Sequence, residues 1–256
     1  SDADLLSAQL KELRLRAFPP SSLKELRKFT SGEAAKLIGV TDAYIRHLSL
    51  AGDAPEAEKT ARGRRLFSLE QVHEIRRTLA KTKQSYAPNR REGEHLQVIA
   101  VTNFKGGSGK TTTAAHVAQH FAMRGYRTLA IDLDPQASLS ALFGLQPEFD
   151  LQENETLYGA IRYDDARRPL SEIIRKTYFS GLDIVPGNLE LQEFEHDTPK
   201  VLAERNRGSE RMFFSRIASA LASVEDNYDV VILDCPPSLG FLTLSALCAA
   251  RSVLVT

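Results

Sequence analysis

A glycine-rich loop with two lysines sets the strongest limit on the fold of this chain. Residues 101–113 read VTNFKGGSGKTTT, and the letters GKT close the phosphate-binding pattern G-x-x-x-x-G-K-[ST]. That pattern places its first glycine where this chain has Phe104, and a second lysine, Lys105, follows directly. Such a loop binds phosphate when it joins a strand to a helix, because the glycine amides and the helix N-terminus then face one anion.

The flanking segments are predicted to supply that strand and helix. Residues 96–103, LQVIAVTN, are apolar and rich in β-branched residues, which is typical of a strand covered on both faces. Residues 111–123 show helical spacing of apolar side chains, and Gly125 follows where glycine commonly ends a helix. A second strand is predicted over residues 127–132. We therefore expect an α/β domain with a mostly parallel sheet flanked by helices.

The loop predicts a site for ATP with Mg²⁺. Backbone N–H groups at the glycines and the positive helix N-terminus would hold phosphate oxygens. Lys110 would bridge the β- and γ-phosphates, and the Thr111 hydroxyl would bind Mg²⁺. The predicted nucleotide contacts are Lys105, Gly106, Gly107, Ser108, Gly109, Lys110, Thr111 and Thr112.

Three aspartates follow predicted strands. Residues 129–138, LAIDLDPQAS, put Asp132 and Asp134 at the carboxyl end of a strand, where open α/β sheets bind ligands. Residues 228–240, YDVVILDCPPSLG, form another β-rich segment that ends at Asp234, the position of a magnesium-binding aspartate. The alternative interpretation of Asp132 and Asp134 is that they belong to a solvated turn without a ligand. The predicted metal site consists of Thr111, Asp132 and Asp234.

The segment KGGSGKTT resembles the deviant Walker A loop of the ParA/MinD family of ATPases, in which the first glycine is replaced and a signature lysine is added. The resemblance implies that Lys105 crosses a dimer to contact the partner's phosphates. It also implies that Asp134, in the DPQ motif, positions the attacking water, and that Asp132 supports the magnesium shell. The expected catalytic residues are Lys105, Lys110 and Asp134. A lysine supplied in trans would make hydrolysis depend on dimerisation; the alternative is a solvated loop lysine.

The front of the chain carries a helix-turn-helix pattern. Thr30 and Glu33 match a capping box that opens a short helix, a turn follows at Gly39, and Thr41 can cap a second helix. Two helices joined by such a turn are typical of proteins whose second helix enters the major groove of DNA. Residues 1–92 also hold 18 Lys and Arg against 12 Asp and Glu, whereas the rest holds 15 against 21. This charge excess favours an anionic partner for the front segment.

A basic turn and a third helix complete the pattern. The run RGRRLF predicts a basic turn followed by a short wing strand at Leu66 and Phe67, and Ser68 with Gln71 matches a second capping box. This order resembles the winged helix-turn-helix of the MerR type. An ordinary small helical domain with a solvated arginine cluster is the alternative. The expected DNA contacts are Thr41, Asp42, Tyr44, Arg46, Arg62, Arg64 and Arg65.

The predicted division of the chain has four parts. A helix over residues 4–18 would either pack within the chain or form a dimerisation arm. We also expect the chain to continue past its last residues, RSVLVT, because a bare apolar edge strand invites aggregation. The predicted parts are an N-terminal arm (1–28), the winged helix-turn-helix (29–80), a linker (81–95) and the ATPase domain (96–256).

Composition narrows the function classes. Two cysteines, Cys235 and Cys248, exclude a disulfide framework and do not match the paired cluster ligands of nitrogenase-type iron proteins. No apolar run reaches the ~20 residues of a membrane helix, and the start lacks the features of a signal peptide. No amphipathic anchor of the kind used by division-site ATPases is visible. We expect a cytoplasmic, nucleoid-associated protein with no membrane partner.

The combined pattern most resembles the larger ParA type, and within it the RepA partition proteins of RepABC plasmids. The resemblance implies an ATP-dependent homodimer that binds DNA without sequence preference and is stimulated by a ParB-like centromere-binding protein. It also implies operator binding and repression of its own operon. The alternative function is a non-enzymatic repressor for which nucleotide is only an effector.

Overall fold

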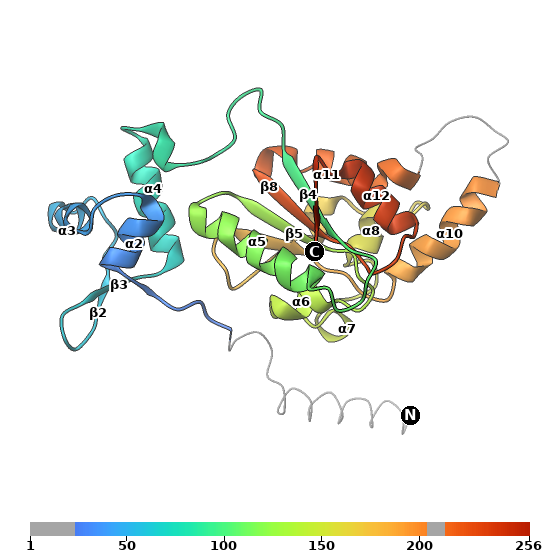
Figure 1. Ribbon diagram of the computed structural model, residues 1–256, viewed down its shortest axis with the longest axis horizontal. Coiled ribbons are helices and arrows are strands. Elements are labelled where there is room, and N and C mark those ends of the chain that lie inside the picture. The colour runs from blue at the N-terminus through green and yellow to red at the C-terminus, as the bar shows by residue number, and fades with distance from the viewer. Residues whose placement is uncertain (1–23, 204–212) are drawn as a thin grey trace, which may run out of the picture.

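The computed structural model describes residues 24–203 and 213–256, so the helix predicted over residues 4–18 lies outside the described part. A six-stranded sheet with helices on both faces forms the larger domain, and a small helical domain lies at one end of it (Figure 1). The prediction of an α/β domain with a mostly parallel sheet is confirmed.

The large sheet brings the carboxyl ends of three central strands together. Its order is β6-β7-β5-β8-β4-β9, and every neighbouring pair is parallel except β6 with β7. Asp132 at the end of β5 lies opposite Asp234 at the end of β8, and Val101 of β4 is the partner of Asp234 on the other side. The strands are β4 (Gln97–Thr102), β5 (Thr128–Asp132), β6 (Arg175–Lys176), β7 (Leu182–Val185), β8 (Val230–Asp234) and β9 (Ser252–Val255).

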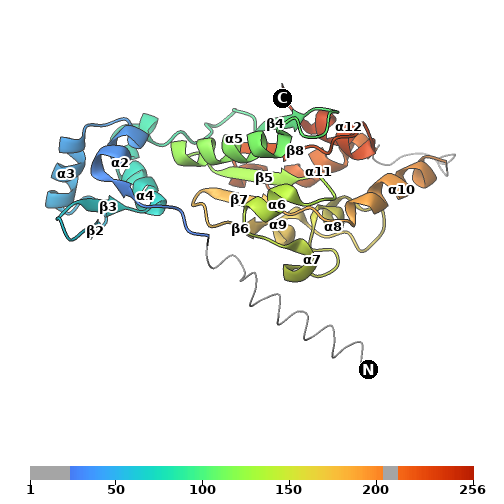
Figure 2. The same cartoon turned by 60° about the horizontal axis from the view of Figure 1, so that its bottom comes forward.

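Helices lie on both faces of the sheet (Figure 2), and alternate strand residues pack against one helical layer or the other. Ala130 and Ile232 pack with the alanines of α5 on one face, whereas Leu129 and Val231 pack with the helices of the other face. Small alanine side chains let α5 approach the sheet closely. The first layer holds α5 (Lys110–Arg124) and α6 (Ser138–Leu142), and the second holds α8 (Leu157–Ile161), α9 (Leu170–Ile173), α10 (Leu191–Ala203), α11 (Arg216–Ala222) and α12 (Phe241–Ala249). Short elements are α7 (Pro147–Asp150), η2 (Gln84–Tyr86), η3 (Phe213–Ser215) and η4 (Glu225–Asn227).

The small domain forms from local capping signals. Both predicted capping boxes are confirmed: the Thr30 hydroxyl accepts from the Glu33 N–H, and the Ser68 hydroxyl from the Gln71 N–H. Gly39, with φ of 87°, ends the first helix in the left-handed conformation that glycine adopts freely. The helices are α2 (Ser31–Ile38), α3 (Asp42–Ala51) and α4 (Leu69–Ala80).

The wing is larger than the sequence indicated. The predicted strand at Leu66 and Phe67 is part of β3 (Arg65–Phe67), which pairs with both β1 (Phe29–Thr30) and β2 (Glu58–Lys59). The basic turn connects β2 to β3, and Gly63 in this turn has φ of 73°. β2 was not predicted, because its two residues are charged and exposed.

The two domains share one apolar core, with α4 lying against the C-terminal end of α5 (Figure 1). His73 on α4 makes a 2.9 Å hydrogen bond from Nε2 to the carbonyl oxygen of Ala122 on α5. The Arg76 guanidinium donates to the carbonyl oxygens of Leu37 and Tyr86. The His73 hydrogen bond and the shared core fix the helix-turn-helix at the far end of α5, the helix that begins at the phosphate loop.

The segment predicted as a linker is anchored to the large domain. The Arg90 N–H donates to Asp229 at 2.9 Å, and its guanidinium pairs with Glu225 at 3.1 Å. Arg127 also donates to Asp229, so this carboxylate joins the linker to the starts of β5 and β8. The connection between the domains is therefore held in place rather than freely hinged.

The last described strand lies at an edge of the sheet. Among the described strands β9 pairs with β4 alone, and Val253, Leu254 and Val255 are exposed. None of the described helices is long and apolar enough to cross a membrane.

Candidate nucleotide site and DNA-binding surface

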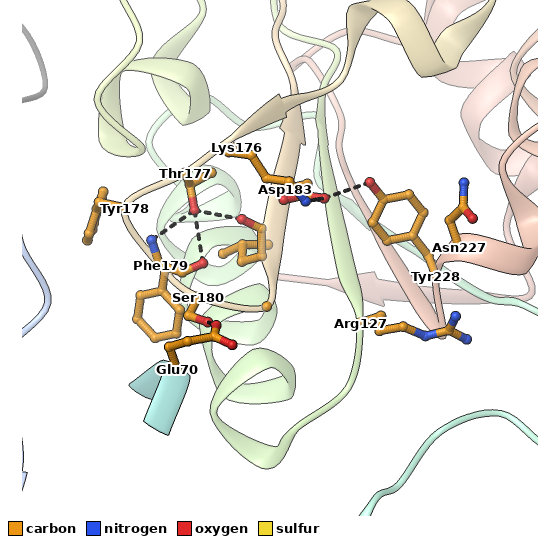
Figure 3. A pocket seen from close by; sticks show the side chains of 12 residues that line it. Glu70, Arg127, Lys176, Thr177, Tyr178, Phe179, Ser180, Asp183, Asn227 and Tyr228 are labelled. Carbon is orange, nitrogen blue, oxygen red and sulfur yellow. Dashed lines mark hydrogen bonds and ion pairs between the residues drawn. The ribbon is translucent and has the colours of Figure 1, made fainter. Parts of the chain in front are cut away.

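The chemistry predicted from the sequence gathers at the carboxyl ends of β4, β5 and β8. A separate cavity of about 650 Å³ lies at the opposite ends of the strands, beside Glu70 of α4 (Figure 3). Its charged groups already have partners: Asp183 accepts from Lys176 and from the Tyr228 hydroxyl, each at 2.8 Å, while Glu70 accepts from Ser180 and Arg127 pairs with Asp229. The phosphate loop and its aspartates are thus the better candidate site.

The phosphate loop turns from β4 into α5 as the pattern requires. Gly107 and Gly109 have φ of 73° and 87°, which are conformations that only glycine adopts without strain. Lys110 begins α5, is 7% exposed, and donates from Nζ to the Lys105 carbonyl oxygen at 3.3 Å. The buried ammonium and the open helix N-terminus place positive charge where a phosphate would lie.

Lys105 and Phe104 lie on the outer side of the loop. Both are exposed, and Phe104 retains 57% of its accessible surface. The Lys105 N–H donates to Asn103 Oδ1 at 2.9 Å, which fixes the backbone while the side chain extends from the loop. Thr112 is also exposed, but it lies in the first turn of α5 rather than in the loop. The role of Lys105 across a dimer stays a prediction.

Asp234 has the environment of a cation ligand. Both of its carboxylate oxygens are buried, and no described residue forms a hydrogen bond to either. Burial raises the pKa of Asp234 from 3.8 to about 7; Asp132 and Asp134 add to the rise, while Thr111 and Lys110 oppose it. The Thr111 hydroxyl lies near enough to stabilise the ionised carboxylate and so lower its pKa, although the two groups do not meet the geometry of a hydrogen bond. A bound cation would compensate the buried charge.

The donor set fits magnesium. Among the described residues, no three His, Cys, Asp or Glu side chains form a metal-binding group. Proteins usually hold Mg²⁺ through one or two carboxylates, with phosphate oxygens and waters completing the shell. Asp234 and the Thr111 hydroxyl meet that description beside the phosphate loop.

Asp132 and Asp134 are placed differently. Asp132 is fully buried, and its oxygens accept hydrogen bonds from Asp134 N–H at 3.1 Å and from Ser140 N–H and Oγ at 2.8 and 2.7 Å. Burial raises the pKa of Asp132 to about 6 despite these donors. Asp134 is only partly buried. With its oxygens engaged by the turn that follows β5, Asp132 suits a supporting role better than that of a direct metal ligand.

The predicted DNA contacts lie on α3 and on the wing. Thr41 caps α3 by accepting from Tyr44 N–H at 3.2 Å, and Arg46 forms an ion pair with Asp42 one helical turn away. Asp42 and Arg46 are therefore occupied with each other here, although exposed pairs of this kind contribute little and separate readily. The remaining cations, Arg62, Arg64 and Arg65, lie on the wing turn and the start of β3, and the first two are exposed.

Two sets of residues were missed from the sequence. His47 stacks on Tyr44 with ring centroids 6.4 Å apart, so it shares the exposed face of α3; the spacing of three along a helix could have indicated it. Ser140 and Gly187 contact the turn after β5, but no local pattern singles them out. Cys235 is buried in the core, and burial raises the pKa of its thiol to about 12.

The fold and the loop define a P-loop nucleotide-binding domain joined to a winged helix-turn-helix. Residues 96–256 match the family described as an AAA domain, and residues 29–83 match the MerR HTH family of regulatory proteins. A putative replication protein A from Rhizobium rhizogenes is 56% identical over 99% of this chain and 63% of its own length. The chain belongs to the ParA/MinD-like family of P-loop ATPases, in a form with a MerR-type helix-turn-helix.

Two further relatives match the large domain. The chromosome partitioning protein ParA from Myxococcus xanthus is 38% identical over 62% of this chain and 51% of its own length. A crystal structure of cobyrinic acid a,c-diamide synthase from Mycobacterium smegmatis, with bound ADP and magnesium, has a TM-score of 0.52 at 34% identity. That match covers 62% of this chain and 59% of the enzyme. The chain spans 63% of the length of the Rhizobium relative.

Proposed function

We propose that this protein is an ATP-dependent partition ATPase that binds DNA and represses its own operon. The observation that carries the proposal is the pair of buried oxygens of Asp234, to which no described residue donates a hydrogen bond, beside Lys110 and Thr111 at the start of α5. A winged helix-turn-helix packed on the other end of the same helix supports a DNA-binding role. Relatives named for chromosome partitioning and replication support the biological setting.

In this proposal ATP lies along the phosphate loop. Glycine amides and the N-terminus of α5 hold its phosphates, Lys110 bridges the β- and γ-phosphates, and Asp234 with Thr111 binds magnesium. The magnesium ion supplies charge neutralisation at the phosphates. Asp134, at the edge of the site, orients the attacking water. The crystal structure of the Mycobacterium enzyme contains ADP and magnesium, which supports an adenine nucleotide and magnesium as the groups bound here.

Dimerisation completes the site. Lys105 extends outward from the loop, so it is free to reach the phosphates on a second copy of the chain. A cation that arrives only with the partner makes turnover slow in the monomer and faster in the dimer. The dimer then binds DNA through phosphate contacts, and a ParB-like protein stimulates hydrolysis.

ATP binding and turnover of wild type and Lys110→Ala test the proposal. Removal of the buried ammonium is expected to lower turnover about a hundredfold or more, whereas Lys81→Ala, an exposed lysine after α4, should leave it unchanged. Equal binding and turnover in wild type and Lys110→Ala would refute the nucleotide site. Nucleotide binding that alters operator affinity without any hydrolysis would instead identify the non-enzymatic repressor.

A further inference from the structure

The turn that carries Asp134 is strained. Ala137 has φ of 54°, in the left-handed region that a residue with a side chain adopts only at an energetic cost. The Ala137 N–H closes the turn on the Asp134 carbonyl oxygen at 2.9 Å, and the Gln136 N–H donates to Asp134 Oδ1 at 2.9 Å. A turn of this kind keeps one conformation only where its surroundings hold it there.

A buried hydrogen-bond network holds both ends of this turn. Asp132 Oδ1 accepts from the Asp134 N–H at 3.1 Å, and Asp132 Oδ2 accepts from Ser140 N–H at 2.8 Å and Oγ at 2.7 Å. Ser140 Oγ in turn accepts from the Gly187 N–H at 3.2 Å. Ser140 therefore connects the carboxylate to the segment that follows β7. Both Asp132 and Ser140 are fully buried, so water does not replace these bonds.

Gly187 packs directly against the same turn. A Cβ atom at this position would lie 2.6 Å from the Asp132 carbonyl oxygen and 3.2 Å from that of Asp134. These neighbours are backbone atoms, so a side chain at Gly187 would have to displace the turn itself. The position of Asp134 thus depends on contacts with both Ser140 and Gly187.

We propose that Ser140 is a positioning residue for hydrolysis, acting through Asp132 on Asp134. The inference rests on the proposed function, in which Asp134 orients the attacking water. Loss of the Ser140 hydroxyl leaves the Gly187 N–H without its acceptor and removes one of three donors to Asp132. The strained turn is then free to relax, and a displacement of about 1 Å at a catalytic group costs on the order of a hundredfold in rate.

Nucleotide affinity is expected to be insensitive to the same change. The phosphates are bound by the loop between β4 and α5, and Ser140 makes no described hydrogen bond to that loop. Ser140→Ala should therefore slow hydrolysis ten- to a hundredfold while the dissociation constant of a fluorescent ATP analogue changes less than threefold. Ser140→Thr, which keeps the hydroxyl, should retain more activity than Ser140→Ala.

A double-mutant cycle distinguishes positioning from a general loss of stability. Single-turnover hydrolysis is measured for wild type, Ser140→Ala, Asp134→Ala and the double variant. If Ser140 acts through Asp134, adding Ser140→Ala to Asp134→Ala has no further effect. Ser245→Ala is the control, since this buried hydroxyl donates to the Phe213 carbonyl oxygen at 3.0 Å away from the turn. Gly187→Ala should reproduce the Ser140→Ala defect without removing a hydroxyl.

The possible results distinguish a failure of the proposed role of Asp134 from a failure of the positioning role of Ser140. Asp134→Ala that hydrolyses ATP as wild type does would overturn the proposed role of Asp134 itself. An inactive Asp134→Ala beside a fully active Ser140→Ala would overturn the positioning role alone, as would equal defects in Ser140→Ala and Ser245→Ala. If Ser140→Ala does not fold, the same comparison with Gly187→Ala decides the question: normal turnover there contradicts the inference.

Discussion

Replacement of Asp234 by asparagine should stabilise the metal-free protein while abolishing its response to magnesium. Both oxygens of this carboxylate are buried without a described hydrogen-bond partner, so in the absence of a cation the ionised form is strongly unfavourable. A side chain that the fold would be more stable without is a mark of a functional residue.

The pKa sets the size of the effect and its pH dependence. The folded-state pKa of about 7 lies above the ordinary value of 3.8, so folding favours the protonated form. Above pH 7 the shift of roughly three units costs about 4 kcal/mol of unfolding free energy, and near pH 5 it costs only about 1–2 kcal/mol. The neutral amide of asparagine and the protonated carboxyl of wild type are both buried without a described partner, so their desolvation costs nearly cancel. We therefore expect Asp234→Asn to gain about 4 kcal/mol at pH 8 and about 1–2 kcal/mol at pH 5.

Urea unfolding in EDTA at pH 5 and pH 8 measures this difference, and repetition with Mg²⁺ and ATP should reverse it, because ligand binding stabilises wild type alone. Asp229→Asn is the matched control. Asp229 is also buried, but its carboxylate accepts from the N–H groups of Arg90 and Arg127 and from the Arg127 guanidinium. Its replacement should destabilise by about 2–4 kcal/mol. A less stable Asp234→Asn at pH 8, or a gain that is equal at both pH values, would refute the reasoning.

Three further predictions concern the domain junction and the wing. Burial lowers the pKa of His73 below 6.5, with Glu70 opposing the shift and Arg76 and Arg77 adding to it. The stability that neutral His73 contributes is therefore complete above pH 6.5 and is lost as the pH falls toward the pKa of His73 in the folded protein. Thermal melts should show that His73→Gln is less sensitive to acid than wild type between pH 7.5 and pH 5. Gly181→Ala should lower the free energy of unfolding in urea by about 2–3 kcal/mol, because φ is +83° and the new Cβ would lie 2.9 Å from the His73 ring. Gly63→Ala, with φ of +73° and open space around it, should cost only about 1 kcal/mol. Equal costs for the two variants would contradict the close contact at Gly181. Arg64→Ala should weaken DNA binding about equally for all sequences and reduce the slope of log K against log salt by about one, and an unchanged slope in a fluorescence-anisotropy titration would remove the wing from the interface.

Local signals predicted the elements that local physics determines. The two capping boxes, the glycine that ends α2 and the strand–loop–helix around Lys110 depend on residues within a few positions of one another, and each forms as expected. β2 escaped prediction because Glu58 and Lys59 carry no apolar pattern; β3 supplies the backbone partners that make them a strand.

The support of the candidate site could not be read from the sequence. Ser140 lies eight residues from Asp132, and Gly187 lies 47 residues beyond Ser140 in the chain, so only the register of β5 and β7 brings them together. The same holds for Arg90, which reads as part of a polar linker but contacts Asp229, 139 residues away. Sequence patterns indicated the candidate groups for the chemistry, whereas the contacts that hold these groups in place come from tertiary pairing.

The most direct test of the account is ATP turnover per subunit as a function of protein concentration, for wild type and Lys105→Ala. A site completed by a second copy predicts turnover that rises with concentration in wild type and stays at the low monomer value in the variant at every concentration. Turnover that is independent of concentration and unaffected by Lys105→Ala would contradict the dimer-dependent site, and would reduce Lys105 to an exposed residue of the phosphate loop.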